Sequence, residues 1–109
     1  MKNENTIVRS PYLGNKELEP GFIYRILNES MRPTLQAGDF LQLKKANKVI
    51  DGKVYAIKVD FDDEYIIRRL YRSVGGYILK SPNPRYTDFE IENGSIIEVF
   101  EVCEVLRLF

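Results

Sequence analysis

The sequence predicts an all-β domain, mainly β, built from several short strands and hairpins. Its apolar segments are short and rich in β-branched and aromatic residues, which favour strands. Glycine, proline, asparagine and aspartate separate these segments, and no long stretch has helical periodicity. With 109 residues and 44% apolar side chains, the chain is large enough for one hydrophobic core.

The leading segment, residues 1–21, is polar and carries spaced prolines and glycines, which indicate an N-terminal arm or linker. The folded domain is expected over residues 22–109. Its first strand is predicted at residues 22–27. Residues 28–38 contain Pro33 and end in glycine, which predicts a turn-rich connection with one helical turn that begins at Pro33.

The middle of the chain predicts hairpins. The acidic residues 60–64 join two apolar segments, and Gly75 with Gly76 forms a second turn. Residues 81–84, Ser-Pro-Asn-Pro, have the composition of a loop. The predicted strands of this part are residues 40–43, 54–59, 65–71 and 77–80.

The last predicted element covers residues 95–109. Glu98, Glu101 and Glu104 lie three residues apart with apolar residues between them, which fits neither the helical period nor the strand period. The β-branched content favours a long, mostly buried strand, and the broken alternation indicates a bulge.

The residue counts exclude several kinds of chemistry. Histidine is absent, which excludes Ser-His-Asp and Cys-His nucleophiles and histidine-bound metals. The one cysteine, Cys103, cannot form an internal disulfide, and its apolar neighbours predict a buried, inert thiol. We expect no metal and no small-molecule cofactor. No apolar run is long enough to span a membrane and no secretion signal is visible, so we expect a cytoplasmic protein without a membrane partner.

Charge is balanced overall but segregated along the chain. The 16 basic and 16 acidic residues give zero net charge, which argues against a general attraction to nucleic acid. Residues 65–85 carry only basic charges, and residues 86–109 are mainly acidic. This pattern needs no binding site, because it is explained by two solvent-exposed faces of the domain or by a basic strand that pairs with an acidic one. The alternative is a nucleic-acid-binding β-barrel that would use Arg68, Arg69, Arg72, Lys80 and Arg85.

The most specific motif of the sequence is Ser-Met-Arg-Pro-Thr-Leu-Gln-Ala-Gly-Asp at residues 30–39. It resembles the Ser-Met-x-Pro-Thr-Leu-x-x-Gly-Asp segment of the LexA and signal-peptidase clan of serine peptidases. Residues 66–70, Ile-Ile-Arg-Arg-Leu, stand where LexA-type proteins carry Lys-Arg-Leu on the second strand of a hairpin. The resemblance covers residues 22–109 and implies a compact, β-clip-like domain of the LexA C-terminal type.

The resemblance also implies roles for individual residues. Ser30 takes the position of the nucleophile, and its backbone N–H is a candidate for the oxyanion hole. Met31 and Pro33 are expected to line the substrate groove. Family members use a neutral lysine to accept the serine proton, and Arg68 occupies that lysine position. A guanidinium stays protonated in proteins and cannot act as this base, so we expect no peptidase activity.

Lys58 is a candidate for a substitute base. If Val59 pairs with Tyr65 in the hairpin, Ala56 lies opposite Arg68. Lys58 then shares the face of Arg68 at a diagonal distance of about 7–8 Å. A solvated lysine on an exposed strand face is the simpler interpretation.

The leading hypothesis is a non-catalytic domain that serves dimerisation or regulation of a phage-type or stress-response transcriptional regulator. No bond before Ser30 matches the Ala-Gly or Cys-Gly self-cleavage site of LexA-type regulators, since the Ala-Gly at residues 37–38 lies inside the motif. In this family the domain forms homodimers, and the apolar C-terminal segment is either a dimer surface or core. DNA would be bound only indirectly, through a separate DNA-binding domain. The alternatives are an active, self-cleaving serine peptidase that uses Ser30 with Lys58, and a signal-peptidase relative, which the lack of a membrane anchor disfavours.

Overall fold

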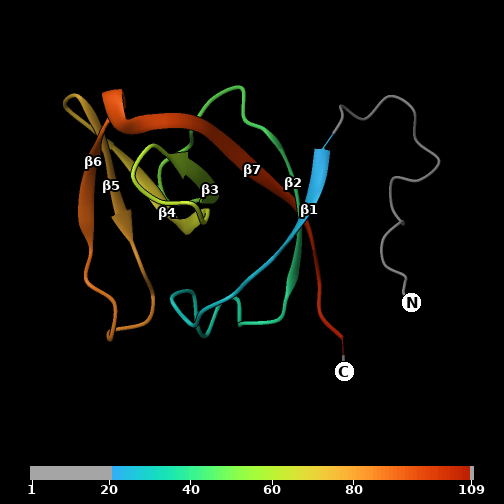
Figure 1. The fold of residues 1–109 in the computed structure, drawn as a ribbon. Coiled ribbons are helices and arrows are strands. Elements are labelled where there is room, and N and C mark those ends of the chain that lie inside the picture. The colour runs from blue at the N-terminus through green and yellow to red at the C-terminus, as the bar shows by residue number, and fades with distance from the viewer. Residues whose placement is uncertain (1–20, 109) are drawn as a thin grey trace.

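The computed structural model describes residues 21–108, which form an antiparallel sheet of seven strands in the order β1-β2-β7-β3-β4-β5-β6 (Figure 1). The predicted all-β class is confirmed. The predicted N-terminal arm lies outside the described residues except for Gly21, which begins the first strand. The strands are β1 (Gly21–Arg25), β2 (Phe40–Lys45), β3 (Val54–Val59), β4 (Ile66–Ser73), β5 (Gly76–Lys80), β6 (Phe89–Glu92) and β7 (Ile96–Leu106), and the 3-10 turn η2 (Asn93–Ser95) precedes β7.

The long strand β7 lies in the middle of the sheet, between β2 and β3. It crosses the molecule from the side of β5 and β6 to the side of β1 and β2 (Figure 1). Its register shifts once against β2, where Cys103 is the extra residue, and once against β3, where Ile97 is the extra residue. The predicted long, bulged strand is therefore confirmed. The two bulges are the reason that the glutamates of this segment do not follow a two-residue alternation.

The burial of β7 differs from the prediction. Its first part is mostly half-buried, and residues 103–106 are exposed. The prediction of a mostly buried strand with a buried Cys103 thiol is wrong, because β3 pairs with residues 96–101 and does not reach this end of β7. Among the strands of residues 21–108, the exposed end therefore has β2 alone as a neighbour.

The sheet packs around two hydrophobic clusters. Successive side chains of a strand point to opposite faces, so β3 contributes to both clusters, Ala56 to the first and Ile57 to the second. The buried members of the first cluster are Ile26, Met31, Leu35, Leu41, Leu43, Ala56 and Ile67. Those of the second are Tyr55, Ile57, Val59, Leu70, Leu79 and Ile91.

The hairpin of β3 and β4 is present as predicted, but the predicted register is wrong by one residue. Ala56 pairs with Ile67, and Arg68 pairs with Tyr55. A shift of one residue moves a side chain to the other face of the sheet. Lys58 is three positions from Tyr55, so it lies on the face opposite Arg68 and not on the same face.

Strand β6 is absent from the sequence-based prediction. Phe89 and Ile91 alternate with glutamates in this strand, and Ile91 is buried while both glutamates are exposed. This alternation is a strand signal, but it extends over only four residues. Pairing with β5 supplies the stabilisation that such a short, acidic segment lacks by itself.

The segment between β1 and β2 is rich in turns, as predicted. Its helical turn is closed by a hydrogen bond from the Leu35 N–H to the Met31 carbonyl oxygen (2.8 Å), so the turn begins before Pro33 rather than at it. This connection carries the whole motif of residues 30–39 except Asp39, which directly precedes β2. The motif therefore lies outside the strands, between two neighbours in the sheet.

Candidate functional site

Ser30 lies in the turn that connects β1 with β2. Its N–H donates to Asn28 Oδ1 (3.0 Å), and the turn ends at Gly38, whose φ of 95° favours glycine. Ser30 is 2% exposed. Local hydrogen bonds and burial therefore hold the serine in one position beneath the surface.

Arg68 reaches Ser30 from strand β4. Its Nη1 donates to Ser30 Oγ (2.8 Å) and also to the carbonyl oxygen of Ile67 (2.8 Å). The structure thus brings together the two residues that the motif assigns to the nucleophile and base positions. The serine hydroxyl oxygen accepts a hydrogen bond from a cation, which is the reverse of what activation of a nucleophile requires.

The surroundings of the Arg68 guanidinium are largely aromatic. Its carbon Cζ lies 5.5 Å from the ring centroid of Tyr86 and 5.9 Å from that of Phe89, within the range of cation–π attraction. Burial lowers the pKa of Arg68, and the nearby Tyr86 and Asp88 act in the opposite direction. An arginine pKa starts so high that the side chain keeps its proton, so the site holds a positive charge where the family's mechanism needs a neutral amine.

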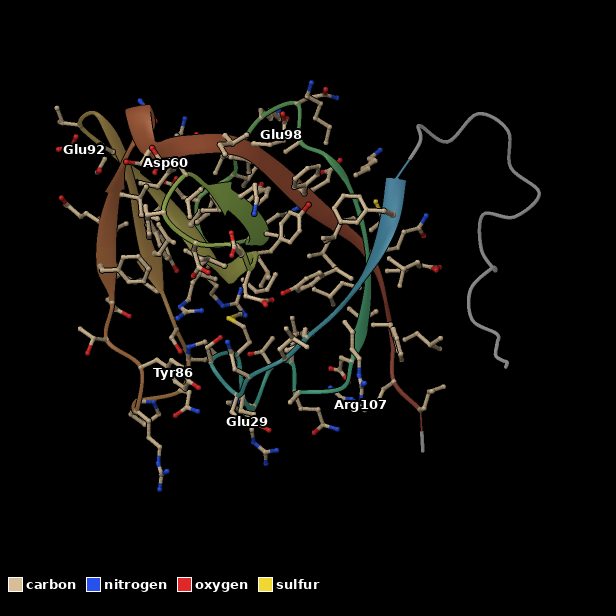
Figure 2. The ribbon with its side chains drawn as sticks, viewed as in Figure 1. Glu29, Asp60, Tyr86, Glu92, Glu98 and Arg107 are labelled. Carbon is tan, nitrogen blue, oxygen red and sulfur yellow. The ribbon has the colours of Figure 1, made fainter. Side chains whose placement is uncertain are left out.

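The loop between β5 and β6 clamps the serine turn from outside. Ser81 Oγ donates to the Ser30 carbonyl oxygen, and Asn83 Nδ2 donates to the Glu29 carbonyl oxygen (2.8 Å). Figure 2 labels Glu29 and Tyr86, which lie at the same end of the molecule on the two segments that these bonds join. The backbone around Ser30 is therefore fixed by side chains that lie about fifty residues away in sequence.

Asp39, the last residue of the motif, has a structural partner. Its carboxylate accepts hydrogen bonds from Arg107 Nε (2.8 Å) and Nη2 (2.9 Å), and from the Gln36 N–H (3.0 Å). Asp39 is 1% exposed, and the hydrogen bonds from Arg107 hold its pKa below the usual value. This pair ties the end of the serine turn to the residue that follows β7.

The amine of Lys58, the candidate substitute base, makes its contacts in the loop between β3 and β4 and not at Ser30. Its Nζ donates to the carbonyl oxygens of Asp62 (3.3 Å) and Asp63 (2.9 Å) and lies 5.5 Å from the ring centroid of Tyr65. Together with its position on the opposite face of the hairpin, these contacts keep the amine away from Ser30. The geometry gives no support to Lys58 as a base.

The residues expected to line a substrate groove do not do so together. Met31 is fully buried in the first hydrophobic cluster, whereas Pro33 is exposed. The Ser30 N–H, expected to be available for an oxyanion, is already bonded to Asn28 Oδ1. Sequence position alone could not reveal this, because the buried contacts of Met31 come from distant strands.

A cleft of about 280 Å³ adjoins the site. It runs between the end of β1, the loop between β3 and β4, and strand β4, and Arg68 forms part of its wall. The lining residues are Tyr24, Ile26, Leu27, Asn28, Phe61, Asp62, Glu64, Tyr65, Ile66, Ile67, Arg68 and Phe89.

The basic residues considered for nucleic-acid binding do not all lie on one surface, although Arg69 and Lys80 are cross-strand partners. Arg68 is 8% exposed and faces Ser30, Arg69 donates to the Gly52 carbonyl oxygen (2.6 Å), and Arg72 pairs with Asp51 (3.2 Å). Within residues 21–108, no helix has the length and apolar character needed to cross a bilayer. The same residues contain no group of three or more side chains arranged to hold a metal ion.

Comparison with known families identifies the group to which the chain is related. The model of the family described as Peptidase S24-like matches residues 2–103, which include the serine turn and the hairpin that carries Arg68. The chain belongs to the Peptidase S24-like family. This is the LexA and signal-peptidase group that the motif resembles, so the resemblance is confirmed. A comparison with curated proteins finds no match.

The sequence does not predict several residues of the site of this Peptidase S24-like domain. Ser81 and Asn83 lie in a segment whose composition predicts only a loop, although serine and asparagine beside prolines commonly bond to backbone groups. Arg107 is a single arginine among acidic residues, and its pairing with Asp39 depends on how β7 crosses the sheet. Tyr86 carries no local signal at all, because only the fold brings it to Arg68.

Proposed function

We propose that this domain is a non-catalytic member of its family that serves dimerisation or regulation of a transcriptional regulator. The observation that carries the proposal is the hydrogen bond from Arg68 Nη1 to Ser30 Oγ (2.8 Å). The arginine has no lone pair to take the serine proton, and the described residues place no other amine on Ser30 Oγ. DNA contact would then come from a separate DNA-binding domain, and the expected compartment is the cytoplasm.

Loss of the base has a large expected effect on rate. General-base assistance alone contributes about 10²–10⁴-fold, and loss of a complete dyad costs more. The 2% exposure of Ser30 adds a second obstacle, since a nucleophile has to approach the carbonyl that it attacks. The proposal also agrees with the sequence of residues 1–29, which contains no Ala-Gly or Cys-Gly bond.

A serine-directed fluorophosphonate probe tests the inactivity. The wild-type chain is expected to remain unlabelled and intact during prolonged incubation at alkaline pH. Arg68→Lys is expected to gain labelling that Ser30→Ala abolishes, because lysine can lose its proton in a buried site. Arg69→Lys is the matched control and should gain none. Labelling of the wild-type chain that disappears in Ser30→Ala would falsify the proposal.

Dimerisation is proposed through the exposed apolar end of β7. Val105, Leu106 and Leu108 are 45%, 36% and 64% exposed, and neighbouring apolar side chains left in water mark an interaction surface. Sedimentation at micromolar concentration should give the mass of two chains, and Leu106→Glu should reduce it to one. Val74→Glu, at an exposed turn on the other side of the sheet, is the control that should stay dimeric. A wild-type mass of one chain contradicts this part of the proposal.

A further inference from the structure

The Arg68 guanidinium carries a buried charge that no carboxylate of residues 21–108 contacts directly, although Asp88 lies near enough to act on it electrostatically. Nη1 donates to two neutral oxygens, Nε is buried without an acceptor, and Nη2 has no acceptor among the described residues. Arg107 uses the same Nε–Nη2 edge to hold the Asp39 carboxylate in a two-bond pair. The Nε–Nη2 edge of Arg68 therefore has no carboxylate on it, and because Nε is enclosed, Nη2 is the group of this edge that can meet a ligand.

The Arg68 side chain forms part of the wall of the cleft beside the serine turn. The aromatic side chains of Tyr24, Phe61, Tyr65 and Phe89 line the same cleft. The cleft volume of about 280 Å³ corresponds to roughly nine or ten non-hydrogen atoms, at about 30 Å³ for each atom-sized water. A space of this size, with aromatic side chains and one buried cation among a mixed polar and apolar lining, has room for a small organic molecule.

The lining of the cleft also includes two carboxylates, Asp62 and Glu64, and the nearby Lys58 ammonium offsets part of their charge. Glu64 accepts a hydrogen bond from the Tyr24 hydroxyl (3.0 Å), and Asp62 Oδ1 accepts one from the Glu64 N–H (2.9 Å). These two carboxylates would repel a second negative charge on a ligand. Phosphates and dicarboxylates are thereby disfavoured, and a single carboxylate at the Arg68 end is favoured.

We infer that the cleft binds an organic monocarboxylate with an aromatic or apolar body, whose carboxylate pairs with the Arg68 guanidinium. Nη2 is the first contact, because Nε itself is enclosed. The same chemistry is offered by a free small acid and by the carboxyl end of a peptide. Such binding goes beyond the proposed function, and it turns the arginine that disables the serine into a recognition element.

Titration with phenylacetate, followed by NMR or calorimetry, tests the inference on the full chain. Phenylacetate should bind and phenylacetamide, which has the same shape without the charge, should bind at least about tenfold more weakly. A short peptide ending in phenylalanine, with a free or an amidated carboxyl end, distinguishes the two sources. Binding of the free peptide points to chain ends, and binding of phenylacetate alone points to small acids.

Three variants show whether phenylacetate binding depends on the Arg68 side chain itself or on the loss of any positive charge nearby. Arg68→Gln should weaken phenylacetate binding about tenfold or more, whereas Arg69→Gln, the neighbouring arginine, should leave it unchanged. Glu64→Gln keeps Arg68 and should tighten binding, because it removes a repelling charge. This variant decides the matter if Arg68→Gln does not fold.

Three results overturn the inference: no phenylacetate binding at millimolar concentration, equal binding of acid and amide, or unchanged binding by a folded Arg68→Gln. These outcomes are distinguishable from failure of the proposed function, which is measured by probe labelling of Ser30. An unlabelled wild-type chain that does not bind carboxylates overturns only the carboxylate site and leaves the proposed function intact.

Discussion

Replacement of Asp39 by asparagine tests whether the part-buried pair with Arg107 holds the serine turn to the end of β7. The carboxylate is 1% exposed and accepts three hydrogen bonds, two of them from Arg107 at 2.8 and 2.9 Å. An amide keeps one acceptor oxygen but turns an NH₂ group toward the guanidinium. Loss of a charge-assisted, part-buried bond of this kind lowers the free energy of unfolding by about 1.5–3 kcal/mol, and the exposure of Arg107 favours the lower half of that range.

Urea unfolding followed by circular dichroism measures this loss. In a thermal melt, the second measurement, a loss of about 2 kcal/mol lowers the Tm of a domain of this size by roughly 8–16 °C. Asp51→Asn is the matched control, because Asp51 also pairs with an arginine but at the exposed surface, where such pairs contribute little. Asp39→Asn that unfolds at the wild-type urea concentration would refute the structural role of the pair.

The same variant predicts a pH dependence with a definite sign. Hydrogen bonds from Arg107 lower the pKa of Asp39 in the folded state, so the carboxylate stabilises the fold above its unfolded pKa of about 4. This contribution is lost as the pH falls through the lower, folded pKa. The stability difference between wild type and Asp39→Asn should therefore shrink in acid, and a difference that grows in acid would contradict the assignment.

The contacts of Tyr24, Met31 and Ser81 yield three more predictions. Burial, and then the hydrogen bond to Glu64, raise the pKa of Tyr24 to about 12, so Glu64→Gln should lower that pKa but leave it above the usual value of 10.0 in an ultraviolet titration. Met31→Ala should cost about 2–5 kcal/mol of unfolding free energy in urea, because the side chain is fully buried; a cost near zero would place it outside the core. Ser81→Ala should cost about 1 kcal/mol and speed amide hydrogen exchange around Ser30, whereas unchanged exchange would mean that the clamp is not needed.

The sequence is sufficient to predict most of the strands and the pairing of Ser30 with Arg68 in the site. Short β-branched segments bounded by turn residues predict the strands, and the motif predicts that Ser30 and Arg68 belong together. The contact between their side chains agrees with that prediction. The long, bulged C-terminal strand is also predictable, because broken alternation in a β-branched segment is typical of a bulge.

The remaining features depend on register and on distant contacts. The register predicted for the hairpin is wrong by one residue, which is enough to place Lys58 on the wrong face. The apolar neighbours of Cys103 predict burial, but its place in a bulge beyond the reach of β3 leaves it exposed. The motif predicts a groove residue at Met31, and only the packing of β2, β3 and β4 against it makes it core.

The insertion of β7 between β2 and β3 has a consequence for how the domain folds. Consecutive strands β2 and β3 do not pair with each other, so the two sides of the sheet are joined through a strand made much later in synthesis. The emerging chain can form the β3–β4–β5–β6 meander by itself, whereas the hairpin of β1 and β2 is joined to this meander in the sheet only through β7. Pairings of such long sequence separation are slow to form because a large loop has to close first. We expect ribosome-bound chains that end before β7 to have an ordered meander and a β1–β2 hairpin that is not yet docked on it, because the pairing with β7 and the bond from Arg107 to Asp39 are both missing.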